Sequence, residues 1–535
     1  MSTKDNYLKG IGRVISLSLA GVAITPLVGC DKDKSDEKPL NILYIMCDDH
    51  SYQTLSAYDN RFINTPNIDR IASDGVLFTN SFVANSISGP SRACMLTGKH
   101  SYANGFTDNR SSFDGSQQTY PKLLQANGYQ TAVIGKWHLT SDPTGFDHWD
   151  ILIGQGDYYN PTFIRNGEKV QRKGYATNVT TDLALDWLEN GRDENKPFCL
   201  LLHHKAPHRT WMPDTCDMDL FADTQFELPE TFYDCYDGRA AAMMQHMSIS
   251  KDMDLVYDLK LADKDSTIHS RPDLERAGRI IYSRMDSLQK RAWDSHYDRV
   301  IADFKRKNPT GKELDKWKFT QYMRDYLRVI TSVDRNIGRI LDYLESEGLM
   351  DNTLIVYTSD QGFYMGEHGW FDKRFMYEES FRTPLLMRLP GGVKGEICQL
   401  VQNIDYAPTI LDVAGVDIPE DIHGVSLLPL LKGEEWTSDR KALYYHYYEF
   451  PDEHAVRPHF GVRTERYKLI RICNVPATEG SGMLDGSWEL FDLQNDPNEL
   501  NNIYDTPGTQ QLTDSLKSIL KDLQILYGEE KFSEI

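Results

Sequence analysis

Short runs of apolar residues recur along the chain, with helically spaced segments between the first few of them. The runs cover residues 40–47, 131–134, 198–202, 354–357 and 385–389. Runs of this length with almost no polar residue predict strands that are buried on both faces. Helical spacing over residues 67–73 and 121–127 supports the alternation. The pattern therefore predicts an α/β fold, with a mostly parallel central sheet flanked by helices.

The strand pattern is interrupted between about Met212 and Glu347. Residues 242–261 and 280–307 have helical spacing, and residues 317–346 predict a long amphipathic helix that packs on the sheet. We expect residues 215–310 to form a helical insertion overhanging the functional edge of a large domain, which covers residues 40–434.

Beyond Gly433 the pattern changes to short, alternating strands. Residues 443–449 and 460–472 predict antiparallel strands, with a turn near Glu465, and residues 488–493 predict another strand. A helix over residues 511–527 follows. We therefore predict a smaller C-terminal α+β subdomain over residues 435–535 that carries an antiparallel sheet.

Residues 1–29 have the layout of a secretory signal. Basic residues precede an apolar run over residues 14–28, which is too short to span a bilayer comfortably. The end of this run, Leu27-Val28-Gly29-Cys30, resembles a bacterial lipobox, and residues 30–39 predict a flexible tether. The alternative is a buried apolar helix of the fold. We expect an exported lipoprotein, lipid-anchored through Cys30, in the periplasm or at the outer membrane or cell surface.

The charge balance limits the choice of partners. The chain has 58 Lys and Arg residues against 79 Asp and Glu residues, a formal net charge of -21. This surplus of negative charge argues against nucleic acid as a partner. An anionic substrate would need a local basic pocket.

Polar residues follow the ends of four predicted strands. Asp48 and Asp49 follow the first strand, Lys136 and His138 the second, His208 the third, and Asp360 with Gln361 the fourth. Ligands of open α/β sheets bind beyond the carboxyl ends of the strands. These side chains are therefore predicted to converge on one site.

The acidic members of this group predict a cation site. Asp48, Asp49, Asp360 and Gln361 offer only oxygen ligands, which suit Ca²⁺ better than Zn²⁺, while Mg²⁺ would demand tighter octahedral geometry. Adjacent aspartates also occur as helix caps or in solvated turns, which is the alternative for Asp48 and Asp49.

Residues 88–98 predict the start of a helix with chemistry at its N-terminal end. Pro90 suits a first helical position, and Gly98 suits a stop. Ser88 would then lie where free N–H groups favour an anion, with Arg92 one turn further on. The alternative is an N-cap serine with a surface arginine.

Further cations and imidazoles complete the candidate chemistry. Arg92, Lys136 and Lys373 could surround an ester anion and stabilise charge in its transition state. His138 and His208 could move protons, whereas single histidines and lysines are more often structural or surface residues.

The complete set of motifs resembles the type I, formylglycine-dependent sulfatases, and the resemblance runs from about Asn41 to the C-terminus. The motifs are Asp48-Asp49, Ser88-x-Pro-Ser-Arg92, Gly135-Lys136-Trp137-His138, Ala206-Pro207-His208, Ser359-Asp360-Gln361-Gly362, and Gly366-Glu367-His368-Gly369 with Lys373. All of them occur in the family's order.

The resemblance implies an alkaline-phosphatase-like fold and a role for each motif. Residue 88 would be oxidised to formylglycine (3-oxoalanine), whose hydrate attacks sulfur, while Arg92 and Lys136 stabilise it. Its Ca²⁺ would be held by Asp48, Asp49, Asp360, Gln361 and the modified residue 88. His208 and Lys373 would bind sulfate and assist the leaving alcohol, and His138 would then take a proton so that sulfate is expelled.

Position 88 is Ser rather than Cys. In the family, serine members depend on a radical-type, oxygen-independent maturase, so the resemblance implies such a partner and a bacterial source.

The residues around Lys373 suggest the substrate. Asp372 and Arg374 flank it and suit the hydroxyl groups of a neighbouring sugar, and His454 and His459 lie in a stretch that could fold over the pocket. Ordinary loop residues are the alternative. These stretches are similar to those of N-acetylglucosamine-6-sulfatases, which implies exo-acting removal of a 6-O-sulfate from N-acetylglucosamine in glycosaminoglycan or mucin glycans.

Three alternatives remain open from the sequence. The enzyme could act on another sugar position, or it could be a phosphatase or phosphodiesterase of the same fold that uses Ser88 directly. A surface glycan-binding lipoprotein with an unconverted Ser88 is the non-enzymatic alternative.

Overall fold

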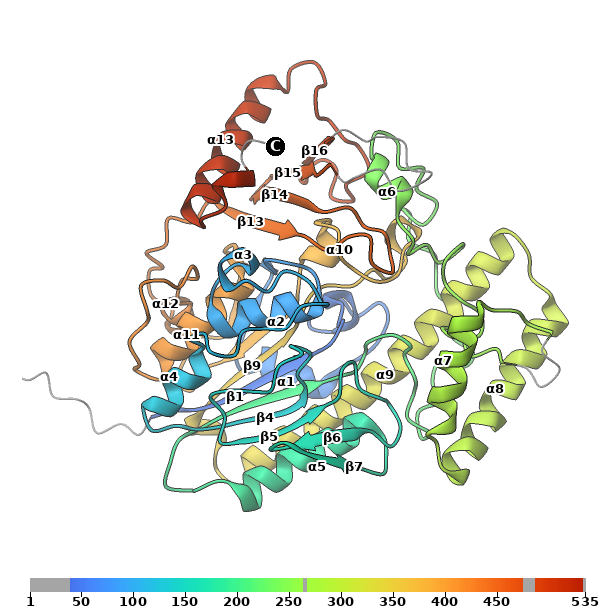
Figure 1. Cartoon of the computed structure of the whole chain (residues 1–535), viewed down its shortest axis with the longest axis horizontal. Coiled ribbons are helices and arrows are strands. Elements are labelled where there is room, and N and C mark those ends of the chain that lie inside the picture. Colours follow the sequence, from blue (N-terminus) through green and yellow to red (C-terminus); the bar gives the residue numbers. More distant parts are fainter. Residues whose placement is uncertain (1–38, 263–266, 475–485, 533–535) are drawn as a thin grey trace, which may run out of the picture. The chain divides into compact units, whose positions relative to one another are not determined.

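Among the residues that the structure describes, ten strands form the central sheet, in the order β11-β2-β10-β9-β1-β8-β4-β5-β6-β7 (Figure 1). The computed structural model describes residues 39–262, 267–474 and 486–532. The predicted signal over residues 1–29, Cys30 and all of the tether but Pro39 lie outside them.

The strands of the central sheet are β1 (Asn41–Cys47), β2 (Val76–Phe78), β4 (Gln130–Lys136), β5 (His148–Leu152), β6 (Thr162–Arg165), β7 (Glu168–Gln171), β8 (Phe198–His204), β9 (Thr353–Ser359), β10 (Leu385–Arg388) and β11 (Gly395–Ile397).

The centre of this sheet is parallel. Strands β9, β1, β8, β4 and β5 run in one direction, with Cys47 opposite both Ser359 and His204 at their carboxyl ends. The fifth predicted apolar strand, β10, instead pairs antiparallel with β9. The expectation of a mostly parallel sheet is confirmed, and its parallel carboxyl ends lie at one edge.

Strand β1 shows why both faces of the sheet are covered. Its alternate residues Leu43 and Ile45 join one core with α1 (Pro66–Ser73), α5 (Ala176–Asp186) and α9 (Lys312–Ser346). The intervening residues, Ile42, Tyr44 and Met46, join a second core with α2 (Ser88–Thr97), α4 (Tyr120–Ala126) and α11 (Tyr406–Val413). Side chains alternate between the faces of a strand, so a continuous apolar run supplies both cores.

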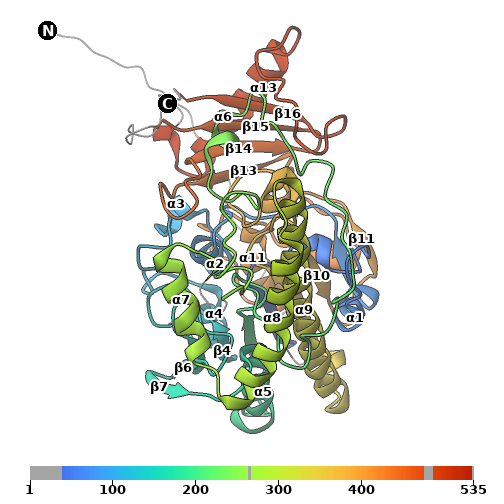
Figure 2. The same ribbon diagram turned by 90° about the vertical axis from the view of Figure 1, so that its right-hand side faces the viewer.

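The region between β8 and α9 corrects one prediction. A helix over residues 242–261 is wrong, because only α6 (Ala240–Met244) forms there and turns follow it. Several apolar residues of this stretch, among them Met247 and Met253, are buried in the core although the chain there is irregular, whereas Met243 is exposed. The helical pattern after residue 280 is confirmed as α7 (Pro272–Ser283) and α8 (Ser287–Lys307), and Figure 2 shows α8 running alongside α9.

The C-terminal region forms a separate four-stranded antiparallel sheet. Its strands are, in order, β13 (Ala442–Tyr447), β14 (His459–Thr464), β15 (Tyr467–Ile472) and β16 (Trp488–Asp492). Helix α13 (Gln510–Leu526) packs on it through Leu516 and Leu520 (Figure 1). The antiparallel sheet and the final helix are therefore confirmed.

The remaining elements are short. The remaining strands and α-helices are the paired strands β3 (Ser81–Phe82) and β12 (Val401–Gln402), and the helices α3 (Ser101–Asn104), α10 (Glu378–Phe381) and α12 (Leu428–Lys432). None of the described helices combines the length and apolar character needed to cross a membrane.

Candidate active site

Ser88 is the first residue of α2. The residue before it, Ile87, is the N-cap, so the alternative in which Ser88 itself caps the helix is wrong by one position. Ser88 is only 1% exposed, and its Oγ donates a hydrogen bond to Asp48 Oδ1 at 3.2 Å. Gly98 ends the helix as predicted, in the left-handed conformation with φ 67°. The helix therefore presents residue 88 to the carboxylates at the end of β1.

Three carboxylates converge beside Ser88. Asp48 and Asp49 follow β1, Asp360 follows β9, and these two strands are parallel neighbours. One oxygen atom of each carboxylate lies within 4.8 Å of the others. The Asp49 amide donates to Asp360 Oδ1 at 3.1 Å, which fixes the two strand ends together. The sheet thus produces the acidic cluster that the sequence predicted.

The same cluster fits a Ca²⁺ ion. All of its donor atoms are oxygens, and Gln361 Oε1 is buried there without a hydrogen-bond partner, although Gln361 Nε2 donates to Asp49 Oδ1. Burial raises the pKa of Asp49 to about 6 and that of Asp360 to about 7. Burial disfavours the ionised form of these carboxylates, and a nearby cation would stabilise that form.

The predicted cations lie among these carboxylates. Arg92 donates from Nη2 to Asp360 Oδ2 at 2.9 Å and from Nη1 to the Lys136 carbonyl at 2.8 Å. Lys136 Nζ contacts Asp48 Oδ2, and Lys373 Nζ donates to both oxygens of Asp49 at 2.7 Å. Burial acts to raise the pKa of Asp48, but Lys136, His208 and Arg92 together outweigh burial and hold this pKa well below its usual value.

The two predicted proton carriers lie at the same edge of the sheet. His208 Nε2 is 3.8 Å from Asp49 Oδ2, and its Nδ1 lies 2.7 Å from the Arg209 carbonyl. His138 Nδ1 is buried without a partner. Burial, reinforced by the charge of Lys136, lowers the pKa of both imidazoles well below the ordinary value. Both imidazoles are therefore neutral at neutral pH.

Asp372, Arg374 and His454 gather next to Lys373. Asp372 Oδ1 accepts from the Lys373 amide at 2.8 Å and is ion-paired with Arg374, and Asp372 Oδ2 lies 3.2 Å from His454 Nε2. Arg374 Nη2 also lies 3.3 Å from Asp452. These side chains are buried and form one polar group, which brings three of the four predicted sugar-binding residues together.

The fourth, His459, does not join that group. It is fully buried in β14, its Nε2 accepts from the Met376 amide at 3.0 Å, and its Nδ1 lies 2.8 Å from the Arg457 carbonyl. Both ring nitrogens are thus bonded to main chain. We correct the prediction for His459: it has no nitrogen available for a substrate.

Two residues of the site were missed from the sequence. Gln155 Oε1 accepts from Lys136 Nζ at 2.5 Å, and Lys205 Nζ donates to the Gln155 carbonyl at 3.1 Å. Gln155 follows β5, whose polar residues hid it from a search for apolar runs. Lys205 directly precedes Ala206-Pro207-His208, and its position there was the available signal.

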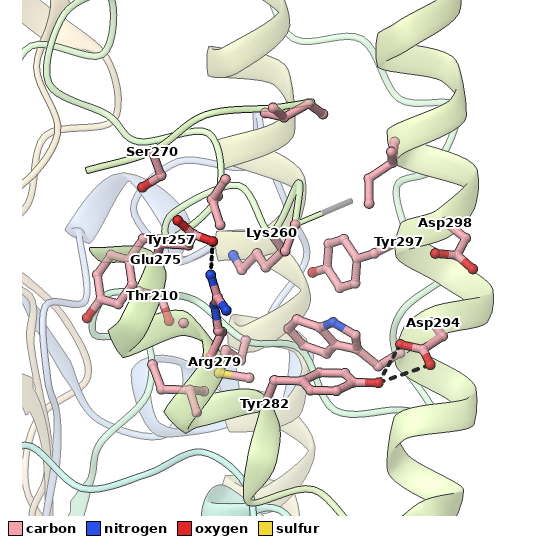
Figure 3. Close-up of a pocket in the computed structure, with 18 of the residues that line it drawn as sticks. Thr210, Tyr257, Lys260, Ser270, Glu275, Arg279, Tyr282, Asp294, Tyr297 and Asp298 are labelled. Atoms are coloured by element: carbon pink, nitrogen blue, oxygen red, sulfur yellow. Dashed lines mark hydrogen bonds and ion pairs between the residues drawn. The ribbon is translucent and has the colours of Figure 1, made fainter. Parts of the chain in front are cut away.

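A cavity of about 430 Å³ lies elsewhere, between α7 and α8 (Figure 3). Two pairs of its polar groups bond to one another: Tyr282 donates to both oxygens of Asp294, at 2.9 and 3.0 Å, and Arg279 is ion-paired with Glu275. It shares no residue with the carboxylate cluster. The predicted site is therefore the strand-end cluster and not this cavity.

Comparison with known proteins tests the assignment of this site. A family model described as sulfatase matches residues 40–416, and one described as N-sulphoglucosamine sulphohydrolase, C-terminal, matches residues 366–525. An N-acetylglucosamine-6-O-sulfatase of Bacteroides thetaiotaomicron is 49% identical over 523 residues, which are 96% of this chain and 91% of that protein.

Solved structures agree. A protein in complex with its substrate D-glucosamine-2-N,6-O-disulfate has a TM-score of 0.86 and 49% identity, with 92% of this chain and 99% of that chain covered. A phosphonate monoester hydrolase of Agrobacterium radiobacter, at 20% identity with a TM-score of 0.64, covers 91% of this chain and 96% of that chain and shares the fold. The residues matched by the sulfatase model include the three carboxylates as well as Arg92, Lys136 and Lys373. The chain belongs to the sulfatase family and is a sulfuric ester hydrolase.

Proposed function

We propose that this sulfatase removes the 6-O-sulfate from a terminal N-acetylglucosamine residue of glycosaminoglycan or mucin glycans. The 49% identity to an N-acetylglucosamine-6-O-sulfatase across nearly the whole chain carries this proposal. The polar group of Asp372, Arg374 and His454 supports it, because it lies against Lys373 and offers charged side chains to a sugar beside the ester.

In the proposed reaction, the chain's cations bind the sulfate group. Arg92, Lys136 and Lys373 are all nearly fully buried and surround Asp48, Asp49 and Asp360. Cations fixed in a poorly solvated site stabilise the charge that develops on sulfate oxygens without having to reorient.

Two groups would complete the site. Formylglycine made from Ser88 would supply, as its hydrate, one hydroxyl to attack sulfur and another for the release of sulfate. Ca²⁺, held by Asp48, Asp49, Asp360, Gln361 and residue 88, would supply fixed positive charge. The orphaned Gln361 Oε1 supports this ligand set.

The imidazoles provide for proton transfer. To His208, which lies next to Lys373's partner Asp49, we assign assistance to the leaving alcohol. To His138, whose buried Nδ1 has no partner among the described residues, we assign removal of a proton from the hydroxyl groups at residue 88. The lowered pKa values leave both imidazoles unprotonated at rest, so His138 can receive a proton, whereas His208 assists the leaving alcohol only in its protonated form.

The cellular setting is part of the proposal. Ser88 implies a radical-type maturase as a partner, and the signal pattern with Cys30 implies a lipid-anchored protein in the periplasm or at the outer membrane or cell surface.

Release of sulfate from a panel of defined sugars tests the proposal. The protein should be co-produced with a serine-type maturase, and mass spectrometry of the peptide containing residue 88 would establish its conversion. We expect turnover of 6-sulfated N-acetylglucosamine, and no release from a 2-O- or 4-O-sulfated sugar or from phosphate monoesters. Turnover of a 2-O- or 4-O-sulfated sugar without release from the 6-sulfated one would contradict it.

A further inference from the structure

The loop after β5 is a tight turn that presents one side chain. Gly156 N donates to the Ile153 carbonyl at 2.9 Å, and both glycines have positive φ, 56° at Gly154 and 72° at Gly156. A Cβ atom at Gly156 would lie 2.8 Å from Leu152 Cδ1. Glycine adopts this left-handed backbone readily on both sides of Gln155, so the turn depends on Gly154 and Gly156.

Gln155 accepts a hydrogen bond from a predicted catalytic lysine. Strands β4 and β5 are parallel neighbours with Lys136 opposite Leu152, so the turn begins directly beside Lys136. Lys136 Nζ contacts Asp48 Oδ2 and donates to Gln155 Oε1 at 2.5 Å. An ammonium group has three N–H donors, so these two acceptors leave one to be directed elsewhere. A flexible lysine stem held by two acceptors points its third donor in a defined direction.

The turn itself is held from the other side of β4. Lys205 follows β8, which pairs with β4 along the edge opposite β5. Its Nζ donates to the Gln155 carbonyl at 3.1 Å and lies 4.8 Å from the centre of the Tyr158 ring. Tyr158 in turn donates to the His208 carbonyl at 2.6 Å. Lys205 is only 6% exposed, so the Gln155 carbonyl and the Tyr158 ring stabilise its ammonium charge where water would otherwise do so.

We propose that Gln155 is a positioning residue for Lys136, and that Lys205 holds the turn that carries Gln155. The inference rests on the proposed function in one respect, since the contact of Lys136 with the sulfate group belongs to that function. Gln155 acts through Lys136: it orients the free N–H of the ammonium toward the ester.

The first test compares Gln155→Ala with the wild type on any sulfate ester that the wild type hydrolyses. Loss of a hydrogen bond to a charged group predicts a kcat lower by about 10- to 100-fold, with KM changed by less than about twofold. Gln155→Glu keeps an acceptor at the same reach, so its kcat should fall less than that of Gln155→Ala, while its added negative charge should raise KM for the anionic ester. Gln171→Ala, which removes an exposed glutamine of edge strand β7, should match the wild type.

The second test is a double-mutant cycle with Lys136→Ala. Because Gln155 acts through Lys136, the change Gln155→Ala should have little effect on kcat once Lys136 is gone. Lys205→Met should lower kcat in the same manner but less, and Lys205→Arg should retain activity. Thermal denaturation of each variant separates these effects from loss of folding.

The outcomes separate this inference from the proposed function. An unchanged kcat for Gln155→Ala, a raised KM alone, or an equal loss with and without Lys136 would overturn the role of Gln155 while leaving the sulfatase reaction intact. A wild type that hydrolyses a sulfate ester at another sugar position would overturn the proposed specificity, and the same ratios of kcat would still test Gln155.

Discussion

Arg92 and Lys136 illustrate how charge is balanced inside the site. They are 2% and 0% exposed, so each needs an acceptor in place of water, and Asp360 and Asp48 provide it. With Lys373 on Asp49, the three cations match the three carboxylates in number. A bound divalent cation would leave an excess of positive charge, which would attract a sulfate ester despite the protein's net charge of -21.

Substitution of Ser88 by Ala should remove activity without unfolding the protein. Ser88 Oγ makes a single hydrogen bond, to Asp48 at 3.2 Å, so its loss should cost about 1 kcal/mol of stability. The residue that would become formylglycine is nevertheless removed, and turnover should fall to background. Sulfate release and thermal denaturation of the variant, produced with the maturase, would check both effects. Activity at the wild-type level would refute the role of residue 88.

Removal of Ca²⁺ should lower stability as well as activity. A ligand that binds only the folded state stabilises it by about 2.7 kcal/mol at a concentration of 100 times its Kd, so chelation should lower Tm and added Ca²⁺ should restore it. Asp360→Asn should weaken this response because it removes charge from the cluster. Asp214 belongs to a second acidic group, paired with Arg335, so Asp214→Asn should respond like the wild type. A Tm insensitive to chelation and to Ca²⁺ would contradict the cation site.

At the scale of elements, α2 depends on the glycine that ends it. Gly98 has φ 67°, and a Cβ atom there would lie 2.8 Å from Ile422 Cγ2. Gly105 ends α3 with φ 72° and has no atom within 4 Å of a Cβ. Gly105→Ala should therefore cost about 1 kcal/mol, the strain of a left-handed residue, and Gly98→Ala about 1–3 kcal/mol more because of crowding. Denaturant unfolding would measure both, and equal losses would show that crowding plays no part.

The elements also show what apolar patterns can and cannot predict. Continuous apolar runs identified β1, β4, β8 and β9, because both faces of these strands are buried. Burial does not depend on the direction in which a strand runs, so the sequence did not show that β10 is antiparallel to β9. A helix was wrongly predicted over residues 242–261 because Met247 and Met253, whose spacing suggested a helix, are buried although they lie in irregular chain. Strands β5 and β6 were missed because polar residues interrupt their apolar runs, and β7 because it is largely polar and exposed.

The candidate site could be predicted further than the elements around it. Asp48, Asp49 and Asp360 directly follow apolar strands and Lys136 ends one, so they were found as soon as those strands were. Arg92 and Lys373 follow no strand end and were found from the motifs that contain them. Gln155 was not found because it follows a strand without an apolar run. His459 was assigned wrongly because its sequence position does not show that both of its ring nitrogens bond to main chain in the folded protein. Partners made by tertiary contact leave no periodic signal in a sequence.

At the scale of the whole molecule, the C-terminal sheet supports the residues around Lys373. Tyr445 of β13 donates to the Arg374 carbonyl at 2.5 Å and accepts from the Ser86 amide at 3.2 Å, two residues before Ser88. Tyr377, which precedes α10, donates to Glu489 of β16 at 2.8 Å. The antiparallel sheet thus contacts both the start of α2 and the loop that carries Lys373.

Glu489 makes this contact sensitive to pH. Burial raises the pKa of Glu489 from 4.5 to about 7, and Oε1 is buried without a partner. The folded state therefore binds this proton more tightly than the unfolded state, so the contribution of Glu489 to stability falls as pH rises from about 4.5 to about 7. Glutamine has the shape of the protonated acid and cannot ionise. Glu489→Gln should match the wild type near pH 5 and be more stable near pH 8, by up to about 3 kcal/mol.

Denaturant unfolding at pH 5 and pH 8 would measure the difference. Glu396→Gln, which changes an exposed side chain of β11, is the matched control and should follow the wild type at both values. Activity at pH 8 should persist in Glu489→Gln, because Tyr377 keeps an acceptor and the loop around Lys373 keeps its contact with β16. If the variant is no more stable than the wild type at pH 8, Glu489 ionises there at no cost in free energy. The contact between Tyr377 and Glu489 would then not make the stability of the protein depend on pH.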